Sequence, residues 1–201
     1  MKQSKFFLKT LRQAPKEAEA ISHKFLVRGC FIEQLTSGVW NFLPLGWRVH
    51  QKIENIIREE MNKIGGQEVY LPVLQPKEIW QKTDRWGKME PPLFKLKNRH
   101  GKELALGSTH EEVITLLAKR FIQSYKDLPI ALYQIQVKFR DEIRPTGGLL
   151  RVIEFIMKDL YSFHPDKKDL DKYYQKVLKA YKKSYQRCGL SALPLEAETG
   201  S

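Results

Sequence analysis

Cysteine is scarce in this sequence, and long apolar runs are absent. The two cysteines among 201 residues, Cys30 and Cys188, match neither a CxxC redox pair nor a zinc-ligand spacing, so the sequence excludes such sites. Two free thiols in a reducing compartment are expected instead, which predicts a cytoplasmic protein. No apolar run approaches the roughly 20 residues of a membrane-spanning helix, and we expect no membrane partner.

Acidic residues are too few to balance the basic ones. Thirty-five Lys and Arg stand against 23 Asp and Glu, which gives a net charge of +12. Such an excess favours a polyanionic partner, either nucleic acid or phosphate groups, without choosing between them. Residues 1–12 are basic but lack the apolar core of a secretory signal. They are interpreted as a short basic segment, with an organellar transit peptide as the alternative.

The chain contains one mixed pattern of helices and strands, without a repeat, low-complexity tract or linker. Its length suffices for one well-packed core and is marginal for two. Apolar residues at helical or alternating spacing, separated by Gly and Pro, predict the elements. These are a helix at 47–64, a strand at 67–74, a loop-rich stretch at 75–100, a strand at 102–107, helices at about 111–126 and 167–187, and the beginning of a strand at 191–201.

The clearest pattern lies at 131–142, ALYQIQVKFRDE, where apolar and polar residues alternate as in a strand with two different faces. After a turn the chain returns at 151–159, so we expect an antiparallel hairpin. No strand–helix–strand unit repeats, and a doubly wound parallel sheet is therefore not expected. The order of elements predicts an α+β fold, with an antiparallel sheet flanked by helices.

Four side chains of this hairpin form a candidate site. Period-2 geometry places Arg140 and Glu142 on one face, and pairing around the turn brings Arg151 and Phe155 to it. Guanidinium groups bind phosphate oxygens, a carboxylate accepts from an exocyclic amine, and a ring stacks on a nucleobase. The combination indicates a nucleoside triphosphate site. The alternative is a solvated ion pair between Arg140 and Glu142, with Phe155 in the core.

A second candidate is the stretch STHEE, residues 108–112. It does not form the HExxH zinc site, because position 114 is Ile114 rather than histidine. Ser108 or Thr109 can cap the helix that follows, with acidic residues favourable in its first turn. The same geometry leaves the Glu111 side chain available to a substrate, so the stretch can serve as a helix cap, as a binding site, or as both.

The stretch FRDEIRP…GLLRVIEFIMKDLYSF resembles motif 2 of the class II aminoacyl-tRNA synthetases, in the form of the bacterial-type prolyl-tRNA synthetase family. Residues 10–61 are similar to that family's N-terminal segment, and GGQEVYLPVL carries the proline of motif 1 at Pro72. LFKLKNRHGKELALGSTHEE resembles the approach to the family's substrate loop, with its Thr-x-Glu at Thr109 and Glu111. EAETGS, residues 196–201, resembles a late strand. The resemblance covers nearly the whole chain.

The resemblance implies ATP-dependent activation of L-proline to prolyl-adenylate, followed by transfer to tRNA(Pro). Arg140 would be the catalytic residue, holding the α-phosphate and orienting the proline carboxylate. In the ATP site, Glu142 would face the adenine amine and Phe155 would stack on the ring. Arg151 would reach the outer phosphates. Magnesium is expected on the phosphates, with its protein ligands outside this segment.

The proline site implied by the resemblance consists of Thr109, Glu111 and Arg140, with the two loop residues receiving the imino group. Pro72, in the strand that forms the subunit interface of that family, implies a homodimer. A plain edge-strand proline is the alternative. The lysine-rich face of 167–187 is interpreted as solvated, with a direct tRNA contact as the alternative.

The domain organisation implied is a partial class II catalytic domain over residues 1–201. Motif 1 would lie at about 47–76, the substrate loop at about 107–112 and motif 2 at about 137–160. Motif 3, an editing insertion and an anticodon-binding domain are not found, so we expect the fold to be incomplete at its C-terminus and these residues alone to be unable to complete the reaction.

Two rival functions fit parts of the pattern. One is a non-catalytic relative that binds RNA or a partner protein. The other is an editing relative that hydrolyses mischarged tRNA, which does not need an ATP hairpin. The intact set of Arg140, Glu142, Arg151 and Phe155 argues against the second.

Overall fold

The computed structural model describes residues 2–7 and 9–196. Its helices are α1 (Ile21–Arg28), α2 (Pro44–Lys63), α3 (Lys77–Lys82), α4 (Glu111–Phe121) and α5 (Lys167–Arg187), with 3-10 turns η1 (Gln3–Lys5) and η2 (Tyr125–Asp127). Its strands are β1 (Ile32–Thr36), β2 (Val39–Phe42), β3 (Gln67–Glu68), β4 (Leu74–Pro76), β5 (Lys95–Lys97), β6 (Glu103–Leu106), β7 (Ile130–Phe139) and β8 (Glu154–Phe163).

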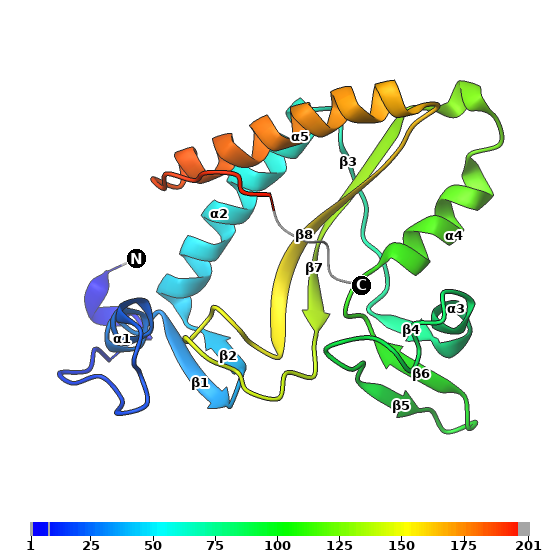
Figure 1. Cartoon of the computed structure of the whole chain (residues 1–201). Helices are drawn as coiled ribbons and strands as arrows, with labels where there is room; N and C mark the ends of the chain where they lie inside the picture. Colours follow the sequence, from blue (N-terminus) through cyan, green and yellow to red (C-terminus); the bar gives the residue numbers. More distant parts are fainter. Residues whose placement is uncertain (1, 8, 197–201) are drawn as a thin grey trace.

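Strands β7 and β8 form the long hairpin at the centre of the molecule (Figure 1). They pair in antiparallel register from Ile130 opposite Phe163 to Phe139 opposite Glu154. On the other edge of β7 lies β3, which runs parallel to it over two residues. The predicted hairpin is therefore present, and the short parallel pair is an addition that the sequence pattern did not indicate.

Two separate cores lie on the two faces of β7. Tyr133 packs with Met61 of α2 and Ala180 of α5, the two helices that run side by side along one face of the hairpin. Leu132, the preceding residue, packs on the other face with Ile114 of α4. Successive side chains of a strand point to opposite faces, so one strand serves both cores. This is the arrangement of helices around a sheet that the order of elements predicts.

The polar residues of β7 are buried, although their alternation also fits a solvated face. Gln134 and Lys138 are 0% exposed and Gln136 is 3% exposed. The Gln134 Oε1 accepts from the Leu71 N–H at 3.2 Å, and the Gln136 Nε2 donates to the Leu71 carbonyl at 2.9 Å. The glutamine side chains thus provide the hydrogen bonds that a neighbouring strand would otherwise give to this backbone.

The prediction of one continuous strand at 67–74 is wrong for its middle residues. The structure has β3 and β4 at its two ends, and Pro72 lies exposed between them, outside any strand. Proline has no N–H to donate to a ladder, and the side chains of Gln134 and Gln136 bind the backbone of the preceding residue instead.

The smaller antiparallel sheet, in the order β4–β6–β5, packs against α3. Ile79 and Trp80 of α3 lie buried against Leu93 and Ala105. A third unit, the β1–β2 hairpin, contacts the central hairpin where the Ile153 N–H donates to the Gly38 carbonyl at 2.8 Å. The predicted α+β class, with antiparallel sheets flanked by helices, is confirmed.

Helix boundaries differ from prediction at two places. Helix α2 begins at Pro44 rather than at residue 47, because proline is favourable in a first helical turn. Helix α4 ends at Phe121 rather than near 126. Beyond it, Ser124 and Asp127 form a capping box that starts the separate turn η2. The last helix, α5, has the predicted bounds.

Part of the predicted last strand lies outside the described residues, because it extends over 197–201. The described part, 191–196, has no strand. The late-strand resemblance of EAETGS falls almost wholly on the same undescribed residues.

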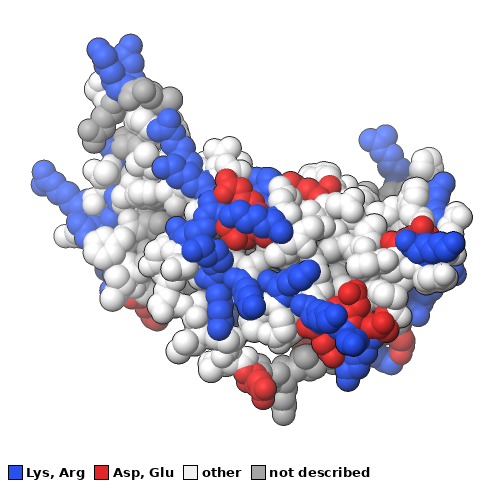
Figure 2. All heavy atoms as spheres, turned by 90° about the horizontal axis from the view of Figure 1, so that it is seen from above, with Lys and Arg blue, Asp and Glu red and all other residues white. Residues whose placement is uncertain are grey.

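Helix α5 carries seven lysines, and all of them are exposed. Figure 2, which looks onto the side of the molecule where α5 and α2 lie in Figure 1, shows Lys and Arg gathered over this face with smaller groups of Asp and Glu. A solvated basic face, as interpreted from the sequence, agrees with this exposure.

We expect Gly46→Ala to destabilise the protein by about 1–3 kcal/mol, the usual cost of an overpacked core position. A Cβ atom at Gly46, in the first turn of α2, would lie 2.0 Å from the carbonyl oxygen of Phe31, which also accepts from the Leu43 N–H. Urea unfolding measures the change. Gly87→Ala is the control, since a Cβ atom there meets no atom within 4 Å. Equal unfolding of the two variants would contradict the prediction.

Candidate functional site

Arg140 and Phe155 lie in contact on the central hairpin. The guanidinium carbon of Arg140 is 5.3 Å from the centroid of the Phe155 ring, and the Arg140 N–H donates to the Ile153 carbonyl at 2.9 Å, which continues the pairing of β7 with β8. The Arg140 Nε is buried without a hydrogen-bond partner. A guanidinium that keeps an unused donor is available to an anion placed beside the ring.

Glu142 and Arg151 form the second pair of predicted residues. The Arg151 Nε donates to the Glu142 carboxylate at 2.7 Å, and the Arg151 side chain is largely exposed while Glu142 is nearly buried. The prediction that strand periodicity continues to Glu142 is wrong, because strand β7 ends at Phe139. The alternative pairing of Arg140 with Glu142 is not what the structure shows, since each has a different partner.

The loop before α4 brings Thr109 against Glu111. The Thr109 hydroxyl donates to the Glu111 carboxylate, and the Gln75 Nε2 donates to the Thr109 carbonyl at 3.1 Å. The expected side-chain cap is wrong: His110 occupies the N-cap position and no side chain accepts a helix N–H there. Thr109 lies one residue before this N-cap position, and its hydroxyl donates to the Glu111 carboxylate.

Arg85 contacts both glutamates at the start of α4. Its Nη1 is 2.9 Å from the buried carboxylate of Glu112 and 3.4 Å from that of Glu111, and its guanidinium lies over the Trp80 ring. A hollow of about 200 Å³ lies beside these groups, with Leu116 in its wall. Glu111 is half exposed, so Arg85 neutralises it only in part and leaves it able to bind a cation.

A buried polar group connects the loop with the hairpin, and sequence reasoning missed it. The Lys138 Nζ is hydrogen-bonded to the His110 Nδ1 and lies 3.0 Å from the carboxylate of Asp159, which faces Gln134 across the hairpin. The backbone N–H of His110 donates to the Tyr161 hydroxyl at 3.2 Å. Lys138 stood in the sequence as one more polar residue of an alternating strand, and nothing local indicated its burial.

Burial governs the ionisation of this group. Desolvation and the neighbouring Lys138 ammonium lower the pKa of His110 to about 4. Burial also lowers the pKa of Lys138, an effect that the Asp159 carboxylate opposes. The pKa of the Tyr161 hydroxyl is raised by burial, and the charges of Asp159 and Glu111 raise it further. At neutral pH the His110 ring is therefore uncharged.

This lowered pKa predicts a loss of stability in mild acid. The unfolded chain binds a proton on His110 near pH 6.5 and the folded protein only near pH 4, so protonation favours unfolding between these values. We expect the free energy of unfolding to fall by about 2 kcal/mol between pH 7 and 5 from this group. Urea unfolding of the wild type and of His110→Asn measures it; the variant should lose that part of the pH dependence, and an unchanged slope would contradict the assignment.

Pro72, the predicted interface residue, is exposed, and its carbonyl oxygen is 3.1 Å from the His110 Nε2. The neighbouring side chains Tyr70 and Leu74 are 80% and 49% exposed. Apolar side chains thus stand on the surface on both sides of Pro72, while the backbone of the same segment is tied to the candidate site.

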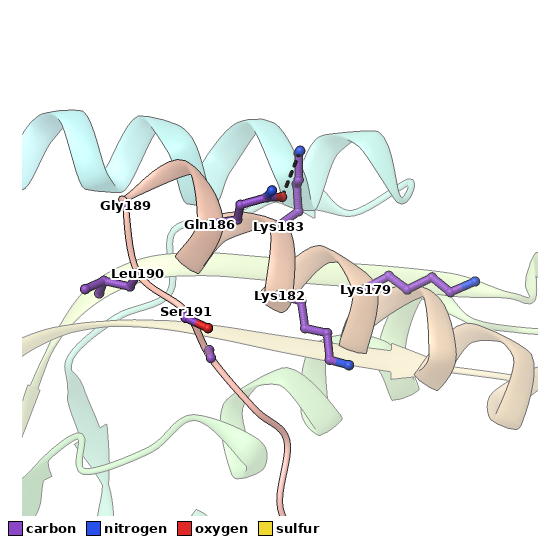
Figure 3. Close-up of a pocket in the computed structure, with 8 residues that line it drawn as sticks. Lys179, Lys182, Lys183, Gln186, Gly189, Leu190 and Ser191 are labelled. Carbon is purple, nitrogen blue, oxygen red and sulfur yellow. Dashed lines mark hydrogen bonds between the residues drawn. The ribbon is translucent and has the colours of Figure 1, made fainter.

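Other groups of the described residues lie apart from this site. A hollow at the C-terminal end of α5 is lined by Lys179, Lys182 and Lys183, which are exposed side chains on one helix (Figure 3). Cys30 and Cys188 are both free. Within 2–7 and 9–196, no three His, Cys, Asp or Glu side chains lie together as a metal site. None of the helices in these ranges combines the length and the apolar composition of a membrane span.

Curated relatives match the whole chain. It is 57% identical over 201 residues to a proline–tRNA ligase of Dehalococcoides mccartyi, 52% identical to that of Pelotomaculum thermopropionicum and 53% identical to that of a Geobacillus species. Each match covers 100% of this chain and 35% of the relative. The chain therefore spans about a third of the length of these relatives, and the resemblance to the N-terminal part of bacterial-type prolyl-tRNA synthetases is confirmed.

A solved structure has the same fold. The prolyl-tRNA synthetase of Giardia lamblia, in complex with prolyl-adenylate, superposes with a TM-score of 0.73 at 24% sequence identity, over 78% of this chain and 33% of that one. Residues 94–200, which include the Thr109–Glu111 loop and the central hairpin, match the family described as the tRNA synthetase class II core domain (G, H, P, S and T). The chain belongs to this family of class II synthetase core domains.

Proposed function

We propose that the protein activates L-proline with ATP, forming prolyl-adenylate and pyrophosphate, and then transfers the prolyl group to tRNA(Pro). The observation that carries the proposal is the contact of Arg140 with Phe155 on the hairpin, joined through buried Lys138 to the loop that holds Thr109 and Glu111. The names of the relatives that match the whole chain support the choice of proline.

In the ATP site, Phe155 stacks on adenine and Glu142 accepts from its exocyclic amine. Arg151, whose side chain is mostly exposed, turns from Glu142 toward the outer phosphates. Arg140 carries a buried, unpartnered Nε next to the ring, and this donor suits an α-phosphate oxygen. The ring and the guanidinium are already adjacent, so base and phosphate are recognised by one short segment of sheet.

In the proline site, the secondary ammonium group of the substrate binds Glu111 and Thr109. Arg140 neutralises the proline carboxylate, one oxygen of which bonds to the α-phosphorus as the bond to pyrophosphate breaks. No protein nucleophile takes part, and the rate depends on alignment and on stabilising the charge that develops on the phosphate. In the second reaction a tRNA 3′-terminal hydroxyl attacks the prolyl carbonyl, and AMP leaves.

The segments that carry these roles are the substrate loop at about 107–112 and motif 2 at about 137–160, with motif 1 at about 47–76. A homodimer through motif 1 is part of the proposal, supported by the exposed apolar side chains on both sides of Pro72. Magnesium would neutralise charge on the ATP phosphates, with its protein ligands outside this segment; among the described residues no cluster of three His, Cys, Asp or Glu is found. The net charge of +12 favours association with tRNA through counterion release. A cytoplasmic location remains our prediction.

The test is amino-acid-dependent ATP–pyrophosphate exchange by the native full-length protein. The five amino acids of the family name (glycine, histidine, proline, serine and threonine) are compared at equal concentration. We expect exchange with L-proline alone, and charging of a tRNA(Pro) transcript with labelled proline. Exchange with another of the five amino acids, or with none, would refute the proposal.

A further inference from the structure

Lys138 is the only buried lysine among the described residues, with a side chain that is 0% exposed. It lies opposite Phe155 in the hairpin and two residues before Arg140, so it is on the strand that carries the proposed ATP site. Removing an ammonium from water costs several kcal/mol unless partners compensate. The carboxylate of Asp159 at 3.0 Å compensates the charge, which leaves the remaining donors of Lys138 to bind a neutral acceptor.

That acceptor is His110, whose ring is also completely buried. An ammonium group has donors only, so the His110 Nδ1 that faces Lys138 must be the unprotonated nitrogen. The Nε2 then carries the proton, and this N–H donates a hydrogen bond to the Pro72 carbonyl at 3.1 Å. Lys138 therefore selects one tautomer of His110, and only this tautomer satisfies both contacts.

His110 is held on a third side by its backbone. The backbone N–H of His110 donates to the Tyr161 hydroxyl of β8. The preceding residue, Thr109, accepts at its backbone carbonyl from the Gln75 side chain. With β7, β8 and the Pro72 segment all binding one residue, the loop cannot shift relative to the hairpin without breaking a buried hydrogen bond. Breaking such a bond leaves a buried donor or acceptor unsatisfied, which is costly.

We infer that Lys138 is a positioning residue for the proposed proline site: through His110 it sets where Thr109 and Glu111 stand relative to Arg140. The inference rests on the proposed function, and deepens it by naming a residue that touches no substrate. Groups that orient the ligands of metal sites change affinity or activity by about 10- to 100-fold when removed, and we expect an effect of similar size for Lys138. Because the loop receives the amino acid and the hairpin receives the nucleotide, the loss should fall on proline rather than on ATP.

The experiment uses Lys138→Met, which keeps the length of the side chain and removes its charge, in the native full-length protein. We expect the KM for proline in pyrophosphate exchange to rise about 10-fold or more, with the KM for ATP within about twofold of wild type. Lys158→Met is the matched control, because Lys158 is a lysine of β8 that contacts Tyr181 of α5 instead. A proline KM within twofold of wild type, or an equal rise in both KM values, would overturn the inference.

A second pair of variants keeps the inference testable if Lys138→Met fails to fold, since they leave the ion pair of Lys138 with Asp159 in place. His110→Asn retains an acceptor for Lys138, and His110→Leu removes it. We expect the proline KM of the Leu variant to be at least about fivefold above that of the Asn variant; equal values would overturn the inference. Wild-type protein without proline-dependent exchange would instead refute the proposed function, so the two failures are distinguishable.

Discussion

Replacing Arg140 by alanine is expected to lower kcat/KM for proline-dependent pyrophosphate exchange by about 10²–10³-fold, the usual cost of removing one preorganised donor to a developing charge. Arg140 is the only residue proposed to touch both substrates. Its Nε is buried without a hydrogen-bond partner, and its guanidinium lies over the Phe155 ring. Among the described residues no other cationic side chain lies over that ring, so the alanine variant loses this positive charge without a replacement. The effect should appear mainly in kcat, because the donor acts most strongly on the transition state.

Two further variants sharpen this prediction. Arg140→Lys should recover only part of the rate, because an ammonium does not reproduce the planar pair of donors of a guanidinium. Arg120→Ala is the control; Arg120 is exposed at the end of α4, and its loss should change the rate by less than about twofold. Exchange by Arg140→Ala at the wild-type rate would remove Arg140 from the site and, with it, the main support for the ATP hairpin.

Replacing Glu111 by glutamine is expected to raise the KM for proline by about 10- to 100-fold while leaving the KM for ATP within about twofold. A hydrogen bond to a charged group contributes about 1.5–3 kcal/mol, and glutamine keeps the size of the side chain but not its charge. Glu111 is half exposed and accepts from the Thr109 hydroxyl, so the substrate ammonium would complete a site that already has one donor. Steady-state pyrophosphate exchange at varied proline and at varied ATP separates the two constants.

Glu78→Gln is the matched control for this variant, because Glu78 is an exposed glutamate in the first turn of α3, as Glu111 is in the first turn of α4. It should leave both constants unchanged. If Glu111→Gln raised the KM for ATP as much as that for proline, the carboxylate would act on the fold of the site rather than on the amino acid.

The hairpin shows how far the sequence predicts this structure. Alternation over 131–142 placed β7, and the glycines of the turn placed its return, because both signals depend on residues that are near neighbours in the chain. The same alternation failed beyond Phe139, where the strand ends and Glu142 turns to Arg151. Strand periodicity holds only while the ladder continues, and the end of a ladder is set by its partner.

Pro72 and Ser108 illustrate the opposite case. The sequence pattern predicts a strand through Pro72 and a helix cap by Ser108 or Thr109; the structure has neither. Side chains from β7, more than 60 residues away in the chain, bind the backbone before Pro72, and the Tyr161 hydroxyl of β8 accepts from the backbone N–H of His110, the residue at the N-cap position. Local propensity gives the available conformations, and distant partners select among them.

The amino-acid sequence by itself determined the α+β class, the bounds of α5, the antiparallel hairpin and the family resemblance, since each is encoded in residue order and short-range spacing. Only the tertiary structure decided that Lys138 is buried, that the His110 ring lies between Lys138 and the Pro72 carbonyl, and that Glu142 pairs with Arg151. The physical reason is that burial and hydrogen-bond partners belong to pairs of residues far apart in the chain. Periodicity predicts which face of a strand a residue lies on, and only tertiary packing determines which groups that residue contacts there.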